Sequence, residues 1–380
     1  MLRCRTALAL FVCLLLSPAG ALAQQTAKPL PTPVQTPAKD SNDPIERIKD
    51  EGLNRSQVMG TLEYLTDAIG PRLTGSPNMK RANEWTRDKL TAWGLRNSHL
   101  EAWGPFGRGW ALKTFSAQVV EPQAIPLIAY PKAWSPGTKG TLVADVVYVD
   151  AKTEADLEKY HGKLKGAIVL TTAPTDIKAH FDAPGHRLDE KDLLKLADAL
   201  DPKAAPPQRR QLTPEQRAAA RLVSKKYAFF NTEGAALLVD PSRAGDGGTI
   251  FVQSATIPQA YVEDQNAPGA PKRINAWDTN APQIAPQVVV AVEDYNRIVR
   301  MLAQGERVRM SVNLEVKFQD ADLMNYNTVA EIPGTDLKDE VVMLGGHMDS
   351  WHSGTGATDN GAGVAVAMEA VRILKALNLQ

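Results

Sequence analysis

Val341-Val-Met-Leu344 runs directly into Gly345-Gly-His-Met-Asp-Ser350, and a second glycine-rich stretch, Gly356-Ala-Thr-Asp-Asn-Gly-Ala-Gly363, follows closely. The first four residues are apolar without alternation, which is typical of a strand buried on both faces. After the glycines, apolar residues recur at helical spacing and predict an amphipathic helix. They are Val364, Met368, Val371 and Leu374. A buried strand, a polar crossing and a helix form half of a βαβ unit, and open α/β sheets bind ligands at such a crossing.

His347, Asp349 and Asp359 all lie in this crossing. A carboxylate two residues from a histidine can orient the imidazole ring, as metal-bound histidines require. Imidazole and carboxylate together suit zinc. Two other interpretations stay open from the spacing alone: Asp359 can cap the following helix, and His347 can be a polar surface residue. A phosphate loop is disfavoured, because the glycines match neither G-x-x-x-x-G-K-[ST] nor G-x-G-x-x-G.

The overall composition restricts the partners of the chain. With 380 residues, 43% of them hydrophobic, it can bury a large core, and its length indicates two domains. Lys plus Arg equal Asp plus Glu at 43 each, and no basic block with interleaved aromatic residues occurs. We therefore expect no nucleic-acid partner. Both cysteines, Cys4 and Cys13, precede the mature chain expected below, which would then lack disulfides and a thiol nucleophile.

The amino end has the features of an export signal. Two arginines precede an apolar run at 7–16 that is too short to span a bilayer, and Ala21-Leu-Ala23 matches the A-x-A cleavage pattern. We therefore expect residues 1–23 to be a cleaved signal peptide and the mature protein to be periplasmic or extracellular. Residues 24–43 are rich in Pro, Thr, Lys and Gln and predict a flexible lead-in. No other long apolar stretch predicts a membrane span.

The secondary-structure signals in the rest of the chain change at two points. Residues 44–113 predict helices and then a strand at 98–103, and residues 319–380 return to strong strand and helix signals. Between them, residues 114–318 contain short β-type runs separated by Pro and Gly, typical of a small β-rich module. Residues 189–226 predict a helical insertion within it. The strands expected in the module are 115–120, 142–149, 167–171, 235–239, 249–252, 287–292 and 309–318. We infer one α/β domain with a β-rich domain inserted into it.

Several helix ends are marked in the sequence. Ser76-Pro77 predicts an N-cap followed by proline at the first helical position, and Gly94 is placed to end that helix. Thr213 and Gln216 have the spacing of a capping box. The break at Gly70-Pro-Arg-Leu-Thr-Gly75 predicts an ordinary interhelix loop, whose arginine could face a substrate.

Gly345–Trp351, taken with Gly356–Gly363, resembles the metal-binding region of the co-catalytic dizinc exopeptidases. This family includes secreted bacterial aminopeptidases and carboxypeptidase Q (plasma glutamate carboxypeptidase), and the Asp-Ser-Trp after the histidine is most similar to the carboxypeptidase Q branch. Residues 327–334 resemble the family's preceding strand and turn, residues 70–76 its amino-terminal loop, and 114–318 its protease-associated domain. The resemblance implies an α/β fold, the zinc-exopeptidase α/β/α sandwich, incomplete in this chain, with an inserted β-rich protease-associated domain.

The resemblance also implies roles for the three polar residues. His347 would bind one zinc ion, Asp359 would bridge two zinc ions, and Asp349 would orient His347. In such enzymes a metal-bridged water attacks the substrate and a glutamate takes its proton. The family carries a Glu-Glu pair on the next strand and an Asp and a His further on, whereas this chain ends at Gln380.

We therefore expect these 380 residues to be the first part of a longer enzyme and to be inactive alone. Glu369 is the only acid after Asp359; we expect it on the exposed side of its helix and assign it no role as a ligand or base. We expect His352 to be a loop residue.

The resulting hypothesis is an exported zinc metallo-exopeptidase that hydrolyses peptides or dipeptides. Carboxypeptidase or dipeptidase action, which the Asp-Ser-Trp match favours, competes with aminopeptidase action. A non-catalytic binding protein on the same scaffold and a phosphohydrolase or deacylase are further alternatives. The oligomeric state is open, with a homodimer as one option.

Overall fold

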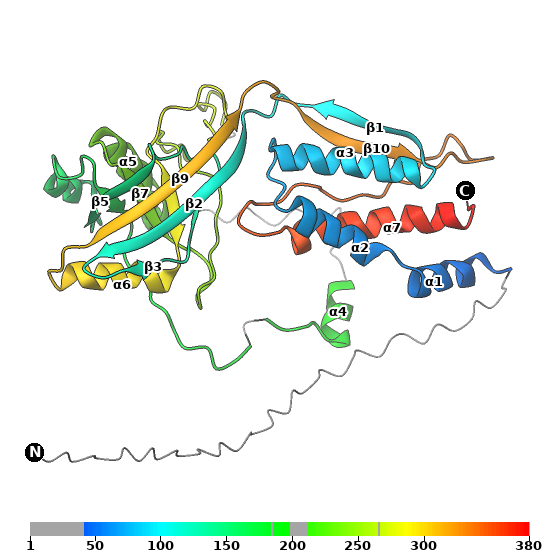
Figure 1. The fold of residues 1–380 in the computed structure, drawn as a ribbon, viewed down its shortest axis with the longest axis horizontal. Helices are drawn as coiled ribbons and strands as arrows, with labels where there is room; N and C mark the ends of the chain where they lie inside the picture. Colours follow the sequence, from blue (N-terminus) through cyan, green and yellow to red (C-terminus); the bar gives the residue numbers. More distant parts are fainter. Residues whose placement is uncertain (1–41, 184, 198–211, 265–266, 380) are drawn as a thin grey trace, which may run out of the picture.

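The computed structural model describes residues 42–183, 185–197, 212–264 and 267–379. The expected signal peptide (1–23) and most of the expected lead-in (24–43) lie outside these residues, so both stay predictions. Figure 1 shows the described chain as two neighbouring parts, a helical layer and a curved sheet with its own helices.

The helical layer combines segments from both ends of the described chain. Its helices are α1 (Pro44–Asn54), α2 (Val58–Glu63), the π-helix η1 (Tyr64–Ile69), α3 (Pro77–Ala92) and α7 (Ala362–Ala376). Strands β1 (Arg96–Trp103) and β10 (Asn325–Glu331) pair antiparallel beside α3, close to the predicted positions (Figure 1). Their apolar side chains, among them Leu65, Ala82 and Met368, form one core cluster. The helix predicted after the glycines is therefore confirmed as α7.

The boundaries of α3 follow from its sequence as predicted. The Met79 amide donates a hydrogen bond of 3.2 Å to Ser76 Oγ, and Pro77 occupies the first helical position. After the helix, Gly94 adopts a φ of 86°, the left-handed conformation that ends many helices.

The larger sheet has eight strands in the order β3-β2-β9-β5-β6-β7-β8-β4. The strands are β2 (Gly109–Glu121), β3 (Ile125–Pro126), β4 (Ala129–Pro131), β5 (Thr141–Tyr148), β6 (Ile168–Leu170), β7 (Leu237–Pro241), β8 (Gln287–Val290) and β9 (Arg309–Gln319). Strands β5 to β8 run parallel, and every other pairing is antiparallel. Because Gly109 pairs with Gln319, the segments that enter and leave this part lie side by side. The predicted boundaries 44–113, 114–318 and 319–380 stay a proposal.

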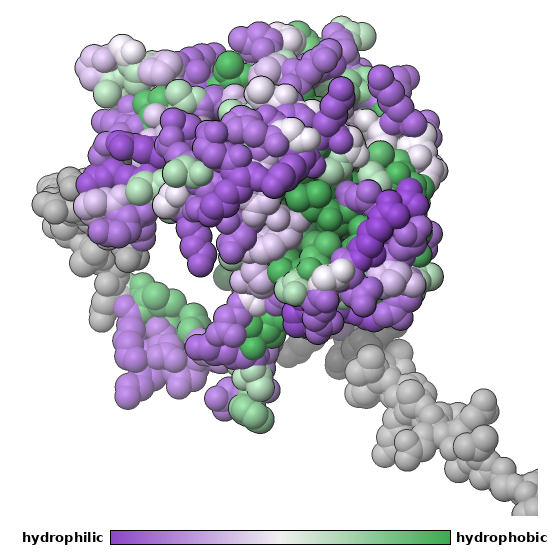
Figure 2. All heavy atoms as spheres, turned by 90° about the vertical axis from the view of Figure 1, so that its left-hand side faces the viewer, coloured by the Kyte–Doolittle hydropathy of each residue, from purple (hydrophilic) through white to green (hydrophobic). Residues whose placement is uncertain are grey.

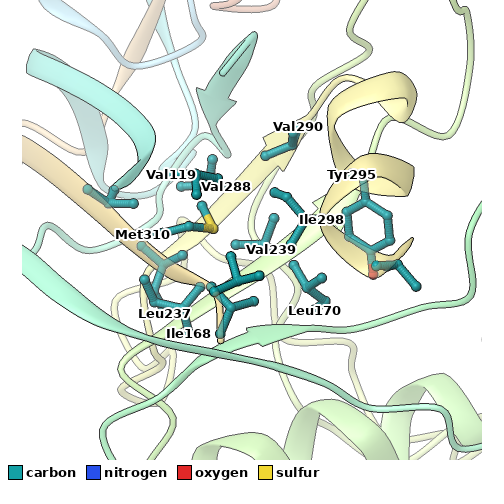
Figure 3. Packing of buried hydrophobic residues seen from close by; sticks show 14 of the residues in the cluster. Val119, Ile168, Leu170, Leu237, Val239, Val288, Val290, Tyr295, Ile298 and Met310 are labelled. Carbon is teal, nitrogen blue, oxygen red and sulfur yellow. The ribbon is translucent and has the colours of Figure 1, made fainter. Parts of the chain in front are cut away.

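Helices cover the sheet, and its strands alternate between two cores. The helices are η2 (Glu154–Tyr160), α5 (Pro214–Thr232) and α6 (Val292–Ala303), whereas α4 (Glu190–Ala197) has no buried residue and lies apart from the sheet (Figure 1). Ile168 and Leu170 join the cluster that contains Tyr295 of α6 (Figure 3). Val169 joins the cluster that contains Phe230 of α5, because successive strand residues point to opposite faces. Each fully buried side chain of this kind stabilises the fold by about 1.5–3 kcal/mol.

Two of the predicted strands are wrong. Residues 249–252 are irregular, and next to them only Ser254 forms an isolated bridge, with Ala133. Residues 341–344 are also irregular, and Val342 and Met343 are 93% and 89% exposed. No strand of the described chain lies beside them, so the hydrogen bonds that would hold a buried strand are missing. Apolar composition alone did not decide their structure.

Two further expectations are confirmed. The capping box of Thr213 and Gln216 opens α5, and the mixed α/β class is the one observed. At the end of the molecule that carries the large sheet, the surface is mostly hydrophilic around a hydrophobic area (Figure 2). Within the described ranges, none of the helices has the length and apolar character needed to cross a membrane.

Candidate metal site

The structure brings His347, Asp349 and Asp359 together. His347 Nε2 lies 3.0 Å from Asp359 Oδ1, and His347 Nδ1 lies 3.1 Å from Asp349 Oδ1. The two carboxylates therefore contact opposite nitrogens of one imidazole ring. The side chains of His347 and Asp359 are 57% and 80% exposed, so an ion can reach them from solvent.

A fully buried arginine holds the loop that carries these residues. The Arg72 guanidinium donates five hydrogen bonds, all to backbone carbonyls. Nε donates to Met348 O at 2.8 Å, Nη1 to Leu65 O, Gly70 O and Thr355 O at 3.0 Å each, and Nη2 to Gly356 O at 2.8 Å. Burial lowers the pKa of Arg72, and the nearby carboxylate of Asp349 acts in the opposite direction. The planar, five-donor guanidinium is suited to join several carbonyls at once.

The backbone of the same segment fixes the loop at two further points. The Ser350 amide donates to Arg72 O at 3.0 Å, and the Arg72 amide donates to Ser350 Oγ at 3.0 Å. Thr74 Oγ1 donates to Asp349 Oδ2 at 2.6 Å. The prediction of an ordinary interhelix loop at 70–75 is therefore wrong, and its arginine faces carbonyls rather than a substrate.

Gly356 allows the loop to close against Arg72. It has a φ of 67°, and a Cβ atom there would lie 2.8 Å from Arg72 Nη2. Only glycine adopts this conformation readily and leaves space for the guanidinium. The chain continues into η3 (Ala357–Gly361), which carries Asp359, and then into α7.

His352 ties the loop to the large sheet. Its ring is 5% exposed, and Nε2 lies 2.7 Å from Pro131 O at the end of β4. Because a carbonyl only accepts, Nε2 carries the proton, and Nδ1 has no hydrogen-bond partner. The ring packs edge-on against Trp110 with centroids 5.3 Å apart, and burial lowers the pKa of His352 to about 4. His352 is a loop residue, as expected, and tertiary packing buries it.

Glu369 is buried, which corrects the prediction that it lies on an exposed face. Arg372 donates from Nε and Nη2 to its two carboxylate oxygens at 2.8 Å each, and the Gln57 amide donates to Oε1 at 3.0 Å. Arg372 Nη1 also donates to Glu51 Oε1 at 2.8 Å. Helices α1 and α2 cover this face of α7, so the carboxylate is neutralised in an interior network.

Two atoms that can bind a metal ion, His347 Nε2 and Asp359 Oδ1, lie next to each other at the exposed site. A tetrahedral zinc ion with ordinary Zn–N and Zn–O distances holds such atoms roughly 3.4 Å apart. The 3.0 Å between His347 Nε2 and Asp359 Oδ1 needs only a small outward rotation of an exposed side chain to reach this. Asp349 contacts the other ring nitrogen of His347, so it is not a third ligand. Within the described ranges, no group of three or more His, Cys, Asp or Glu could hold a metal ion. An imidazole nitrogen and a carboxylate oxygen are ligands that zinc binds, and the described residues supply these two.

Residues 327–380 match the family model described as Peptidase family M28. This segment is therefore similar to peptidase family M28. The chain is 28% identical to carboxypeptidase Q of Bos taurus over 323 residues, which cover 84% of this chain and 54% of that protein. It is 26% identical to carboxypeptidase Q of Mus musculus over 322 residues, 84% of this chain and 55% of that protein. The chain thus spans about half the length of the curated relatives it matches.

The fold of the chain also has a solved counterpart. A crystal structure of a Peptidase M28 precursor from Shewanella amazonensis SB2B has a TM-score of 0.51 and 24% identity. The match covers 87% of this chain and 62% of that one. The predicted resemblance to these exopeptidases, nearest to the carboxypeptidase Q branch, is therefore confirmed.

Sequence reasoning found the polar residues of the M28 segment but missed most of their supports. Arg72, Thr74, Ser350 and His352 all hold the metal-site loop, and none was predicted to do so. The one available signal was the likeness of residues 70–76 to the family's amino-terminal loop. This likeness indicates that residues 70–76 contribute to the site, but it does not show which residues they contact.

Proposed function

We propose that the protein is an exported zinc-dependent metallo-exopeptidase of the carboxypeptidase Q type, which hydrolyses peptides or dipeptides. The supporting observation is that His347 Nε2 and Asp359 Oδ1 lie 3.0 Å apart in a segment that matches family M28. His347 and Asp359 are the proposed ligands.

Each residue of the site has a defined part in this proposal. Asp349 accepts the Nδ1–H of His347, which leaves the Nε2 lone pair directed at the ion. The Thr74 hydroxyl bonds the other oxygen of Asp349, so this carboxylate is held at both oxygens. When bound, zinc polarises the scissile carbonyl and lowers the pKa of water.

Two zinc ions are part of the proposal, with Asp359 as the bridging ligand. Its Oδ1 faces His347, and within the described residues its second oxygen has no hydrogen-bond partner. With 80% of the side chain exposed, that oxygen is open to a second ion.

Zinc binding tests the ligand assignment. In calorimetric titrations with zinc, Asp359→Ala should bind far more weakly than the unchanged chain, and Asp349→Asn about 10–100-fold more weakly, as losses of orienting partners do. Asp339→Ala is the matched control, because Asp339 is exposed and outside the site. If Asp359→Ala binds zinc like the control, Asp359 is a residue of the helix start and the ligand assignment fails.

Peptide hydrolysis tests the activity and its direction. A free dipeptide, its amino-acetylated form and its carboxyl amide separate the alternatives when offered to the zinc-loaded full-length protein, because these 380 residues are expected to be inactive alone. Cleavage that survives acetylation but not amidation supports the carboxypeptidase type, and the reverse pattern supports an aminopeptidase. Zinc binding without cleavage of any peptide would favour a non-catalytic protein on this scaffold. A mature amino terminus near Gln24 would support export.

A further inference from the structure

A cavity of about 720 Å³ lies in the part of the chain that contains the large sheet. Its wall includes residues at the carboxyl ends of two parallel strands, Thr172 after β6 and Asp240 in β7. Ligands of α/β sheets bind at this edge, and the volume is in the range of small-molecule sites, about 300–1,000 Å³. None of its lining residues belongs to the zinc site proposed above.

A buried charged cluster forms the floor of the cavity. Lys132 Nζ pairs with Asp240 and lies 3.2 Å from Tyr227 Oη, which donates to Asp240 Oδ2 at 2.6 Å. Thr171 Oγ1 donates to the other carboxylate oxygen. An ion pair at such depth is weak evidence for stability, because apolar side chains of similar volume stabilise a core as well. Its position at the base of a cavity is typical of a binding site.

The rim of the cavity carries uncompensated positive charge. Arg243 and Arg273 both line it and are both exposed. Arg243 contacts the Gln253 amide and lies over the Phe251 ring, 5.0 Å from its centroid, whereas Arg273 has no hydrogen bond or ion pair with any residue of the described chain. Asp240 is the only acid in the lining, and Lys132 already neutralises it. Two guanidinium groups therefore remain available to an anion.

Aromatic side chains supply an apolar surface beside these charges. Phe251 and Trp277 line the cavity. Trp277 is held from behind by stacking on Phe106, with centroids 5.4 Å apart and an angle of 11°, and by contact with Trp134 at 4.8 Å. A fixed aromatic wall next to two cations suits a ligand that is anionic at one end and apolar at the other.

We propose that this cavity binds a small dicarboxylate with an apolar group, such as the acidic end of a peptide. Its carboxylates pair with Arg243 and Arg273, since guanidinium matches carboxylate geometry. Its apolar group packs against Phe251 and Trp277.

Calorimetric titration with three probes tests the site. The probes are acetyl-Phe-Glu, its neutral counterpart acetyl-Phe-Gln amide, and inorganic phosphate. The acidic peptide should bind at least about tenfold more tightly than either of the others, because losing one charge-assisted contact typically has that effect. Added salt should weaken its binding, because the arginines are exposed.

Variants of the rim separate this site from general electrostatic attraction. Arg243→Gln and Arg273→Gln should each weaken acetyl-Phe-Glu about tenfold. Arg297→Gln, an exposed arginine of α6 outside the cavity, should change nothing. Zinc binding should stay unchanged in all three variants, which separates this proposal from the zinc site. Equal binding of acid and amide, equal binding of phosphate, rim variants that match Arg297→Gln, or no binding at millimolar concentration would each overturn it.

Discussion

Replacing Arg72 with methionine should loosen the helical layer more than any exposed substitution. The variant keeps an unbranched apolar side chain of similar length but removes all five donors. Two of the five carbonyls keep a second donor, because the Gly70 amide bonds Leu65 O and the Gly361 amide bonds Gly356 O. The carbonyls of Met348, Gly70 and Thr355 would lose the donor they have.

Each of these part-buried carbonyls would lose a hydrogen bond to a charged donor, worth about 1.5–3 kcal/mol, and removing a desolvated guanidinium returns part of that. The net loss should be about 3–5 kcal/mol. Amide hydrogen exchange is the suitable assay, because it reports the opening free energy of each element separately. Protection should fall in η1 and α7 and stay unchanged in β6 and β7, whose core does not include Arg72.

Two further variants separate the shape of the guanidinium from its charge. Arg72→Lys keeps the charge but cannot reach carbonyls on both sides, so it should recover only part of the loss. Arg87→Met is the control, because Arg87 forms an exposed ion pair with Asp88 and should change protection by less than about 0.5 kcal/mol. Amide protection of η1 and α7 that is unchanged in Arg72→Met, or fully recovered in Arg72→Lys, would refute the reasoning.

Three other predictions concern the helical layer and the loop that carries the proposed metal ligands. Arg372→Met should destabilise the helical layer by about 3–5 kcal/mol, since it leaves Glu369 buried without a cation and Glu51 with Arg55 as its remaining cation; a loss under about 1 kcal/mol in urea unfolding would contradict this. For His352, folding lowers the pKa from 6.5 to about 4, so the unfolded chain binds the proton first and stability should fall as pH decreases through this window. The loss should approach about 3 kcal/mol, and His352→Gln should lack this part of the pH dependence in urea unfolding. Gly356→Ala should destabilise the loop by at least about 1–2 kcal/mol, measured by hydrogen exchange, because its backbone is left-handed and its added Cβ would clash with Ser350 and Arg72, whereas Gly354→Ala, with nothing near its added Cβ, should leave the loop unchanged.

Local sequence determined the elements whose signals lie within a few residues. The caps of α3 and α5, the apolar stripe of α7 and most strands of the large sheet follow from spacing, capping chemistry and composition, and the structure agrees. The close placement of His347 and Asp349 has the same origin, since only one residue lies between them in the chain. Such features are predictable because the interacting groups are neighbours in the chain.

Tertiary structure decided the features that depend on distant partners. Arg72 and Ser350 are 278 positions apart, and nothing near either residue specifies the other. Glu369 is interior because α1 and α2 cover it and Arg372 neutralises it, although its helix alone predicted an exposed position. The apolar residues 341–344 show the converse, since without a neighbouring strand in the described chain they are exposed. A side chain is buried, and a polar group is hydrogen-bonded, only when a partner surface is present. One stretch of sequence shows its own residues but not the distant segment that packs against them.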